Sequence, residues 1–273
     1  MTTSAPRWIY AFAEGDGRNK MLLGGKGANL CEMTRIGLNV PPGFVITTEA
    51  CLACLGDAGR NLPAGLLDAV RTEMASLARQ TGKRLRGGDD PLLVSVRSGS
   101  AMSMPGMMDT ILNLGLNETT LAALIRHTGN ERFGYDAWRR FIQLFGKVAL
   151  GVPDALFDEQ FEAVKSRVGV KQDVMLGADE LREIGCRFLQ VVQRHTGQPF
   201  PADPYEQLEI AIKAVFNSWT GKRAIDYRRE FKITPAMANG TAVNVVAMVY
   251  GNMGNDSATG VGFTRNPATG ENQ

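Results

Sequence analysis

The stretch of sequence that decides the fold begins as a strand and continues into a long run of small residues. It reads Ser95-Val96-Arg97-Ser98-Gly99-Ser100-Ala101-Met102-Ser103-Met104-Pro105-Gly106-Met107-Met108-Asp109-Thr110. Residues 92–97 predict a buried strand, and Arg97 stands at its end, where α/β folds place ligand-binding groups. Residues 98–113 predict an irregular loop that is longer than packing requires. Two interpretations stay open: the methionines of 102–108 fill gaps in a core, or the loop folds over a nucleotide and exposes backbone donors to phosphates.

A second glycine-rich segment, Gly24-Gly25-Lys26-Gly27, precedes a short helix that we predict over 28–36. Unpaired N–H groups and the helix dipole at such a helix start favour an anion, and Lys26 adds a positive charge. The segment lacks the spacing of a Walker A loop, and the chain contains no GxGxxG motif. It indicates either a phosphate-binding loop or an ordinary turn.

The third segment lies near the end of the sequence, where 242–250 and 260–264 predict two strands of a hairpin. An apolar strand such as Val246-Ala247-Met248-Val249 can stack on an adenine and offer backbone groups to its edge, or it can be a plain buried strand. A lone hairpin is marginal in water, and this one lacks the remaining strands of a sheet. We therefore expect the sequence to be the front part of a longer protein.

The remaining pattern is helical in the middle of the chain and mixed before it. Strands are expected at 8–12 and 44–47, and helices at 63–81, 118–127, 133–150, 154–168, 178–195, 204–219 and 221–230. Three of these helices end in a cation, a threonine and then a glycine, at 79–82, 126–129 and 194–197. This pattern accounts for His127 and His195 without catalysis, and we expect His195 on the apolar stripe of its helix.

Composition excludes several classes of protein. A length of 273 residues corresponds to about two compact units. A composition of 44% hydrophobic and 21% charged residues excludes an intrinsically disordered protein. Thirty Lys and Arg against 28 Asp and Glu leave a net charge of +2, without the basic footprint of a nucleic-acid partner. The densest apolar stretch, 243–250, is far shorter than the roughly 20 residues that span a bilayer. Residues 1–20 lack a secretory core, so we expect a cytoplasmic protein without a membrane partner.

The four cysteines do not form a disulfide framework in a chain of this length. Cys51 and Cys54 follow a good helix start at 47–50, and their spacing puts both on one helix face. We interpret them as a buried, reduced pair, with a redox or metal role as the alternative. Cys31 and Cys186 lie in helical patterns and are expected in the core.

Together the three segments carry a resemblance to a known family. From Trp8 to Gln273 the chain resembles the N-terminal, nucleotide-binding part of pyruvate, phosphate dikinase, which has an ATP-grasp fold. The most specific match is 97–115; other close matches are 23–34 with 42–44, and 240–241 through 266–271. Phosphoenolpyruvate synthases resemble the chain at the Gly-Gly-Lys loop and Arg97, but they lack the Met-Pro-Gly-Met-Met-Asp-Thr run.

The resemblance implies an α/β (α+β) fold of the ATP-grasp type with a helical insertion subdomain. Residues 1–115 plus 200–240 would form the first ATP-grasp subdomain, 116–199 the helical subdomain, and 241–273 the start of the second subdomain. It also implies the conversion of ATP, phosphate and pyruvate to AMP, diphosphate and phosphoenolpyruvate through a phosphohistidine. The alternatives are a phosphoenolpyruvate synthase-like enzyme and a non-catalytic nucleotide-binding module.

The same resemblance implies roles for individual residues. Lys26 and Arg97 match catalytic residues that contact the ATP phosphates, and fixed positive charge suits phosphoryl transfer. The other expected nucleotide-binding residues are Gly99, Ser103, Met104, Gly106, Asp109, Thr110, Arg140, Met248 and Val249. Mg²⁺ is expected to accompany ATP, with its ligands downstream of Gln273 rather than within this chain. The phosphohistidine and pyruvate-binding domains are expected on the same polypeptide. The full enzyme is expected to be a homodimer, and this chain alone is not expected to complete the reaction.

Overall fold

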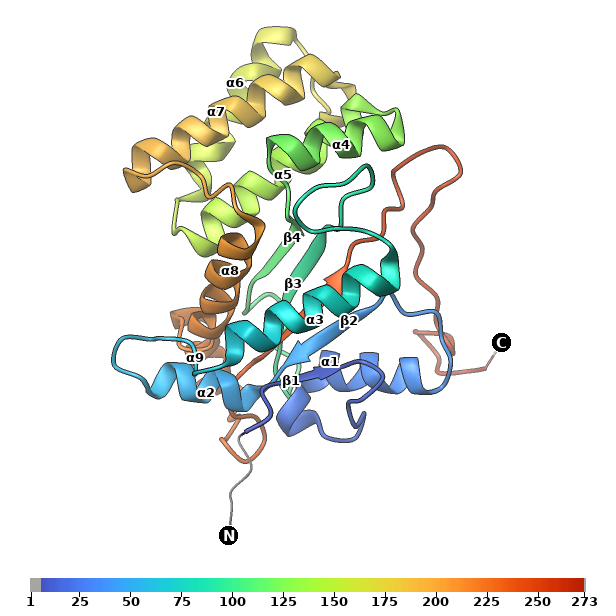
Figure 1. Ribbon diagram of the computed structural model, residues 1–273, viewed down its shortest axis with the longest axis vertical. Helices are drawn as coiled ribbons and strands as arrows, with labels where there is room; N and C mark the ends of the chain where they lie inside the picture. The colour runs from blue at the N-terminus through green and yellow to red at the C-terminus, as the bar shows by residue number, and fades with distance from the viewer. Residues whose placement is uncertain (1–5, 273) are drawn as a thin grey trace.

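The computed structural model describes residues 6–272, and its centre is an antiparallel sheet (Figure 1). The strands are β1 (Ile9–Ala11), β2 (Gly43–Ile46), β3 (Val94–Gly99), β4 (Thr110–Leu114) and β5 (Ala242–Ala247). Their order across the sheet is β1-β2-β5-β3-β4, and every neighbouring pair is antiparallel. The last strand in the chain is therefore the central one. The assignment of 241–273, which includes this strand, to the start of a second subdomain stays a prediction.

Helices surround the sheet and also form a layer of their own. They are α1 (Lys20–Arg35), α2 (Thr48–Gly56), α3 (Leu66–Thr81), α4 (Glu118–Thr128), α5 (Glu131–Ala149), α6 (Asp154–Val168), α7 (Ala178–Thr196), α8 (Pro204–Ser218) and α9 (Lys222–Glu230), with a short 3₁₀ turn at Asp173–Met175. In Figure 1, α4 to α7 gather at the end of the molecule opposite α1. The expected mixture of helix and sheet with a helical portion is confirmed.

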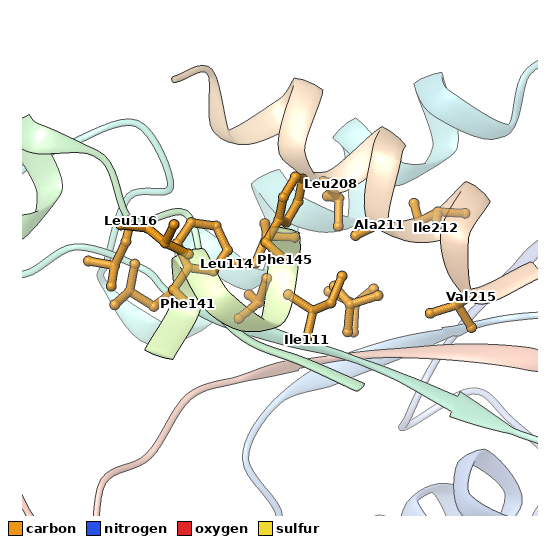
Figure 2. Packing of buried hydrophobic residues seen from close by; sticks show 14 of the residues in the cluster. Ile111, Leu114, Leu116, Phe141, Phe145, Leu208, Ala211, Ile212 and Val215 are labelled. Atoms are coloured by element: carbon orange, nitrogen blue, oxygen red, sulfur yellow. The ribbon is translucent and has the colours of Figure 1, made fainter. Parts of the chain in front are cut away.

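The main core lies between one face of the sheet and the helices that cover it. Its centre joins Ile111 and Leu114 of β4, Phe141 and Phe145 of α5, and Leu208, Ala211, Ile212 and Val215 of α8 (Figure 2). The four-residue spacing of Phe141 and Phe145 puts both rings on one face of α5. Both rings are fully buried, and burial of such a side chain stabilises the fold by about 1.5–3 kcal/mol.

The opposite face of the sheet is covered in part by α1. A smaller buried cluster joins this helix to the sheet through Phe12, Leu23, Ala28, Cys31, Val45, Ala242 and Val246. Arg97 of β3 lies directly across from Asn244 of β5, and cross-strand partners share a face of a sheet. Because Asn244 lies beneath Gly27 of α1, Arg97 projects from the face that α1 covers, and its side chain is exposed.

Two expected features of the sheet are wrong. Residues 98–113 are not one irregular loop, because β3 continues to Gly99 and Thr110–Leu114 forms β4. The missed strand pairs with β3 across a register shift, which hides its alternation in the sequence. Residues 242–264 do not form a hairpin: the strand ends at Ala247, and 260–264 is irregular. Val261 is 82% exposed and Phe263 67% exposed, so this segment has no face to bury against a sheet.

Helix ends follow the expected chemistry. Gly82, Gly129 and Gly197 each cap a helix in the left-handed conformation, after last turns that contain Arg79, His127 and His195 respectively. Both histidine side chains are exposed, so His195 does not belong to the apolar stripe of α7. His195 lies in the last turn of α7, beyond Val192, which is the last buried residue of that helix.

The cysteines divide into two groups. Cys31, Cys51 and Cys54 are buried free thiols, as expected, whereas Cys186 is exposed and its expected place in the core is wrong. It lies on the outer side of α7 next to the buried Gly185, which the ring of Trp138 contacts. Among residues 6–272, no helix has both the length and the apolar character needed to cross a membrane.

Candidate functional site

The first component of the site is a kink inside α1. The helix begins at Lys20, capped by the Asn19 side chain, rather than at residue 28 as expected. Gly24 interrupts it with φ 67° and ψ 163°, a region that is essentially restricted to glycine. A Cβ atom at Gly24 would lie 2.7 Å from the carbonyl carbon of Gly99. Glycine at this position therefore lets the end of β3 approach the restarted helix, and the Gly25 N–H donates to the Ser100 carbonyl at 2.8 Å.

The second component is a pair of cations on this face of the sheet. The Lys26 Nζ donates a hydrogen bond to the Ser98 carbonyl at 2.9 Å, so it is held by the strand end rather than by a carboxylate. Burial, and next the nearby positive charge of Arg97, lower the pKa of Lys26. An anion beside these two residues would relieve their repulsion, because an opposite charge favours the protonated amine.

The third component is a cavity of about 500 Å³ between α1 and the loop that follows β3. It is lined by Lys20, Gly25, Lys26, Asn29, Ser98, Gly99, Ser100, Ala101, Met102, Ser103, Met104, Pro105, Gly106 and Met108. The buried Ser100 hydroxyl has no hydrogen-bond partner there, which is costly unless a ligand or water supplies one. Met104 is 6% exposed and anchors the loop to the core. The cavity thus combines a cation, backbone groups and an unpaired hydroxyl.

The expected residues of the loop occupy different places. Gly99, Ser103, Met104 and Gly106 line the cavity. Asp109 does not, because its carboxylate accepts a hydrogen bond from Arg223 of α9 at 3.0 Å. Thr110 begins β4 directly across from Arg97. The structure therefore brings Lys26 and most of the loop residues together, with Arg97 and Thr110 at the neighbouring strand positions.

Three other expected residues lie elsewhere. The Arg140 side chain is exposed, and its Nε is 2.8 Å from Asp136 Oδ2 one turn earlier in α5. Met248 and Val249 line a separate cavity of about 340 Å³ that has no residue in common with the first cavity. This second cavity also contains Lys83, Asp90 and His127, with Lys83 Nζ 3.0 Å from Asp90 Oδ2.

Some residues of the site were missed by sequence reasoning. Lys20 and Asn29 line the cavity from the first part of α1 and from the helix after the kink. Their i to i+9 separation gives no sequence signal, because the kink breaks the helical period. Asn244 is 1% exposed and donates to the Arg97 carbonyl at 3.3 Å, while its Oδ1 has no partner. An asparagine within the apolar run of β5 is the sequence signal that could have indicated a polar contact at this position.

Comparisons with known proteins agree on one family. The family described as "Pyruvate phosphate dikinase, AMP/ATP-binding domain" matches residues 20–77 and 58–273. The chain is 61% identical, over 97% of its length, to pyruvate, phosphate dikinase of Entamoeba histolytica, and 49% identical, over 98%, to that of Rhizobium meliloti. It is 52% identical, over 95%, to pyruvate, phosphate dikinase 1, chloroplastic, of Oryza sativa subsp. japonica.

The matched region is a minor part of each of these proteins. It covers 30% of the amoebal and rhizobial proteins and 27% of the rice protein. The chain therefore spans about 30% of the length of the curated relatives that it matches. Because the family match includes the kinked helix, the loop after β3 and the central strand β5, the chain belongs to the pyruvate phosphate dikinase family and corresponds to its AMP/ATP-binding domain.

Proposed function

We propose that this chain binds ATP, with the phosphate groups in the cavity between α1 and the loop after β3. The observation that carries this proposal is the convergence of Lys26, the kink at Gly24 and the unpaired Ser100 hydroxyl on one cavity. Its volume of about 500 Å³ is within the range of small-molecule sites. The chain would then act as the nucleotide-binding part of an enzyme that converts ATP, phosphate and pyruvate to AMP, diphosphate and phosphoenolpyruvate.

The proposed chemistry is electrostatic. Phosphoryl transfer spreads negative charge over the equatorial oxygens, so fixed positive charge lowers the barrier without covalent chemistry by the protein. Lys26 would contact the phosphates directly, and Arg97 would contribute from the exposed side of the same sheet face. Gly99, Ser103, Met104 and Gly106 would cover the phosphates as parts of the loop.

Magnesium is part of the proposed substrate complex, but the described residues do not fit a resident metal site. Within residues 6–272, no three His, Cys, Asp or Glu side chains gather closely enough to hold a metal ion. The expectation that Mg²⁺ arrives with ATP and is held by residues downstream remains a proposal.

The remaining expectations are also proposals. Met248 and Val249 would bind the base, and Arg140 would have to leave Asp136 to reach a phosphate. The relatives are more than three times longer than this chain, which supports further domains on the same polypeptide. We propose that these carry the phosphohistidine and the pyruvate site, that the full protein is a cytoplasmic homodimer, and that this chain alone does not complete the reaction.

Two alternatives remain in different classes. A phosphoenolpyruvate synthase-like enzyme is disfavoured because the run from Met104 to Thr110 resembles dikinases, and because relatives matching 97% and 98% of this chain are named pyruvate, phosphate dikinase. A non-catalytic nucleotide-binding module is disfavoured because the relatives that match nearly the whole chain are named pyruvate, phosphate dikinase, an enzyme.

Calorimetric titration of MgATP into the chain tests the proposal, with Arg97→Ala as the site variant and Arg194→Ala as the matched control. Arg194 is an exposed arginine at the end of α7, in the helical layer. We expect binding by the native chain and by Arg194→Ala, and binding at least about tenfold weaker by Arg97→Ala, since an interaction with a charged group contributes about 1.5–3 kcal/mol. Equal affinities for all three proteins would refute the proposed site.

A further inference from the structure

The loop between β3 and β4 is held by a residue from a distant part of the chain. Arg223, in the first turn of α9, donates to the Asp109 carboxylate at 3.0 Å and to the Gly106 carbonyl at 3.4 Å. These two contacts join residues more than 110 positions apart in the sequence. They bind the second half of the loop, whereas the first half is held by Met104 in the core and by the Gly25–Ser100 backbone bond.

The helix that carries Arg223 is itself fixed to the body of the molecule. Ala224 is fully buried, and Arg228 lies 3.8 Å above the ring of Trp219 while donating to the Trp219 carbonyl at 3.0 Å. The neighbouring Lys222 pairs with Asp226, four residues later in the same helix. Arg223 therefore reaches the loop from a helix that packs against the body of the molecule.

The contact to Asp109 also has an electrostatic consequence. Asp109 is the only acidic residue between 98 and 110, and its charge lies on a loop that lines the cavity proposed above to hold the phosphates. An unpaired carboxylate there would oppose the approach of phosphate groups. Arg223 neutralises it, and the pairing also places the carboxylate toward α9 rather than toward the cavity.

We propose that Arg223 is a positioning residue that holds the 98–110 loop over the cavity through Gly106 and Asp109 and compensates the loop's negative charge. The holding of the loop stands on the geometry alone, whereas the effect on phosphate binding rests on the proposed function. Among the described residues, the hydrogen bond to the Gly106 carbonyl is the one that Arg223 makes to the cavity lining.

Hydrogen–deuterium exchange of the ligand-free chain measures the holding of the loop. The reporters are the Met107 N–H, bonded to the Met104 carbonyl, and the Ser98 N–H, bonded to the Asp109 carbonyl. We expect Arg223→Ala to speed exchange in the peptide covering 98–109 by about two- to fivefold, the effect typical of a partly exposed ion pair. Lys222→Ala, the control on the same helix, should leave exchange unchanged.

Calorimetric titration with MgATP, and with inorganic tripolyphosphate as a probe without a base, measures the effect on binding. Arg223→Ala should weaken both ligands by about two- to fivefold. Arg223→Lys, which keeps the charge, should retain part of the affinity. Adding Asp109→Asn to Arg223→Ala should recover affinity by removing the uncompensated carboxylate, without restoring slow exchange. A purely structural role of Arg223 would not produce this separation of affinity from exchange.

The outcomes separate this inference from the proposed function. Faster exchange in Arg223→Ala, with no binding of either ligand even by the native chain, would support the holding of the loop and refute the proposed function. Unchanged exchange in Arg223→Ala would overturn the inference. If exchange were unchanged while binding was lost, Arg223 would contact the ligand directly, and a positioning role would equally be overturned.

Discussion

The substitution Gly24→Ala tests whether the kink in α1 is what permits the close approach of the helix to the sheet. The added Cβ would lie 2.7 Å from the Gly99 carbonyl carbon and 3.3 Å from the Ala242 Cβ. Both contacts are with backbone or with a short side chain in the sheet, so neither neighbour can rotate away. The helix and the strand end must separate, and the cavity between them would open.

The expected loss of stability has two parts. Holding alanine at φ 67° and ψ 163° costs about 1–3 kcal/mol, and overpacking in a dense region costs about a further 1–3 kcal/mol. The sum of about 2–6 kcal/mol is a large fraction of the 5–15 kcal/mol by which a typical domain is stable. Because Gly99 and Gly25 border the cavity, MgATP affinity should fall in the same variant.

Urea unfolding followed by tryptophan fluorescence would measure the first effect, with two glycine controls. Gly65→Ala also has a positive φ, 76°, but its ψ of −8° places it in the left-handed helical region, and no atom lies within 4 Å of the added Cβ, so it reports the cost of a left-handed alanine without a clash. Gly25→Ala needs no left-handed conformation, and its Cβ would lie 3.3 Å from the Ser100 carbonyl oxygen. We expect Gly24→Ala to lose clearly more stability than either control. A loss within about 0.5 kcal/mol of that of Gly65→Ala would refute the steric argument.

Three further predictions concern individual side chains. Burial and Arg97 lower the pKa of Lys26, so its amine loses its positive charge as the pH rises toward the ordinary lysine pKa of about 10.4. MgATP affinity should fall over that pH range in the native chain but not in Lys26→Arg, and calorimetry at several pH values tests both. Burial raises the pKa of Cys51 to about 12, so the free energy of unfolding should fall as the pH rises above about 8.5, by up to about 1.4 kcal/mol per pH unit. Cys51→Ala should flatten that slope in urea titrations, and an unchanged slope would contradict the assignment. Tyr250→Phe removes a hydrogen bond of 3.1 Å to the buried Asn113 Oδ1 and should lower stability by about 1–3 kcal/mol; an unchanged urea midpoint would show that the bond contributes nothing.

Helices with local signals could be predicted from the sequence almost to the residue. The predicted bounds 154–168 are those of α6, where Pro153 precedes the first turn and Gly169 follows the last. The start of α1 could not be predicted in the same way. Its first turn, 20–23, is joined to the rest across Gly24, and the glycine-rich sequence reads locally as a loop. The close approach of β3 at Gly24 is a long-range contact, and the local sequence gives no sign of it.

Residues of the site could be predicted where a functional group lies in a distinctive local sequence. Lys26 and the loop residues up to Gly106 meet that condition, and they line one cavity. The partner of Asp109 does not meet it, because Arg223 lies in a helix whose sequence shows only an ordinary charged surface. Long-range pairing of exposed charges leaves no periodic trace in a single sequence.

The order of the strands explains why the site depends on the whole chain rather than on its two glycine-rich segments. The end of β3 is held by the strand that enters last: the Thr241 hydroxyl accepts from the Gly99 N–H at 3.2 Å, and the Asn244 amide donates to the Arg97 carbonyl at 3.3 Å. Without β5, the end of β3 would lose both of these bonds, and α1 would lose Ala242 and Val246 from the face that it packs against. The cations and the loop are encoded early in the sequence, but their geometry is set by a strand more than 140 residues later.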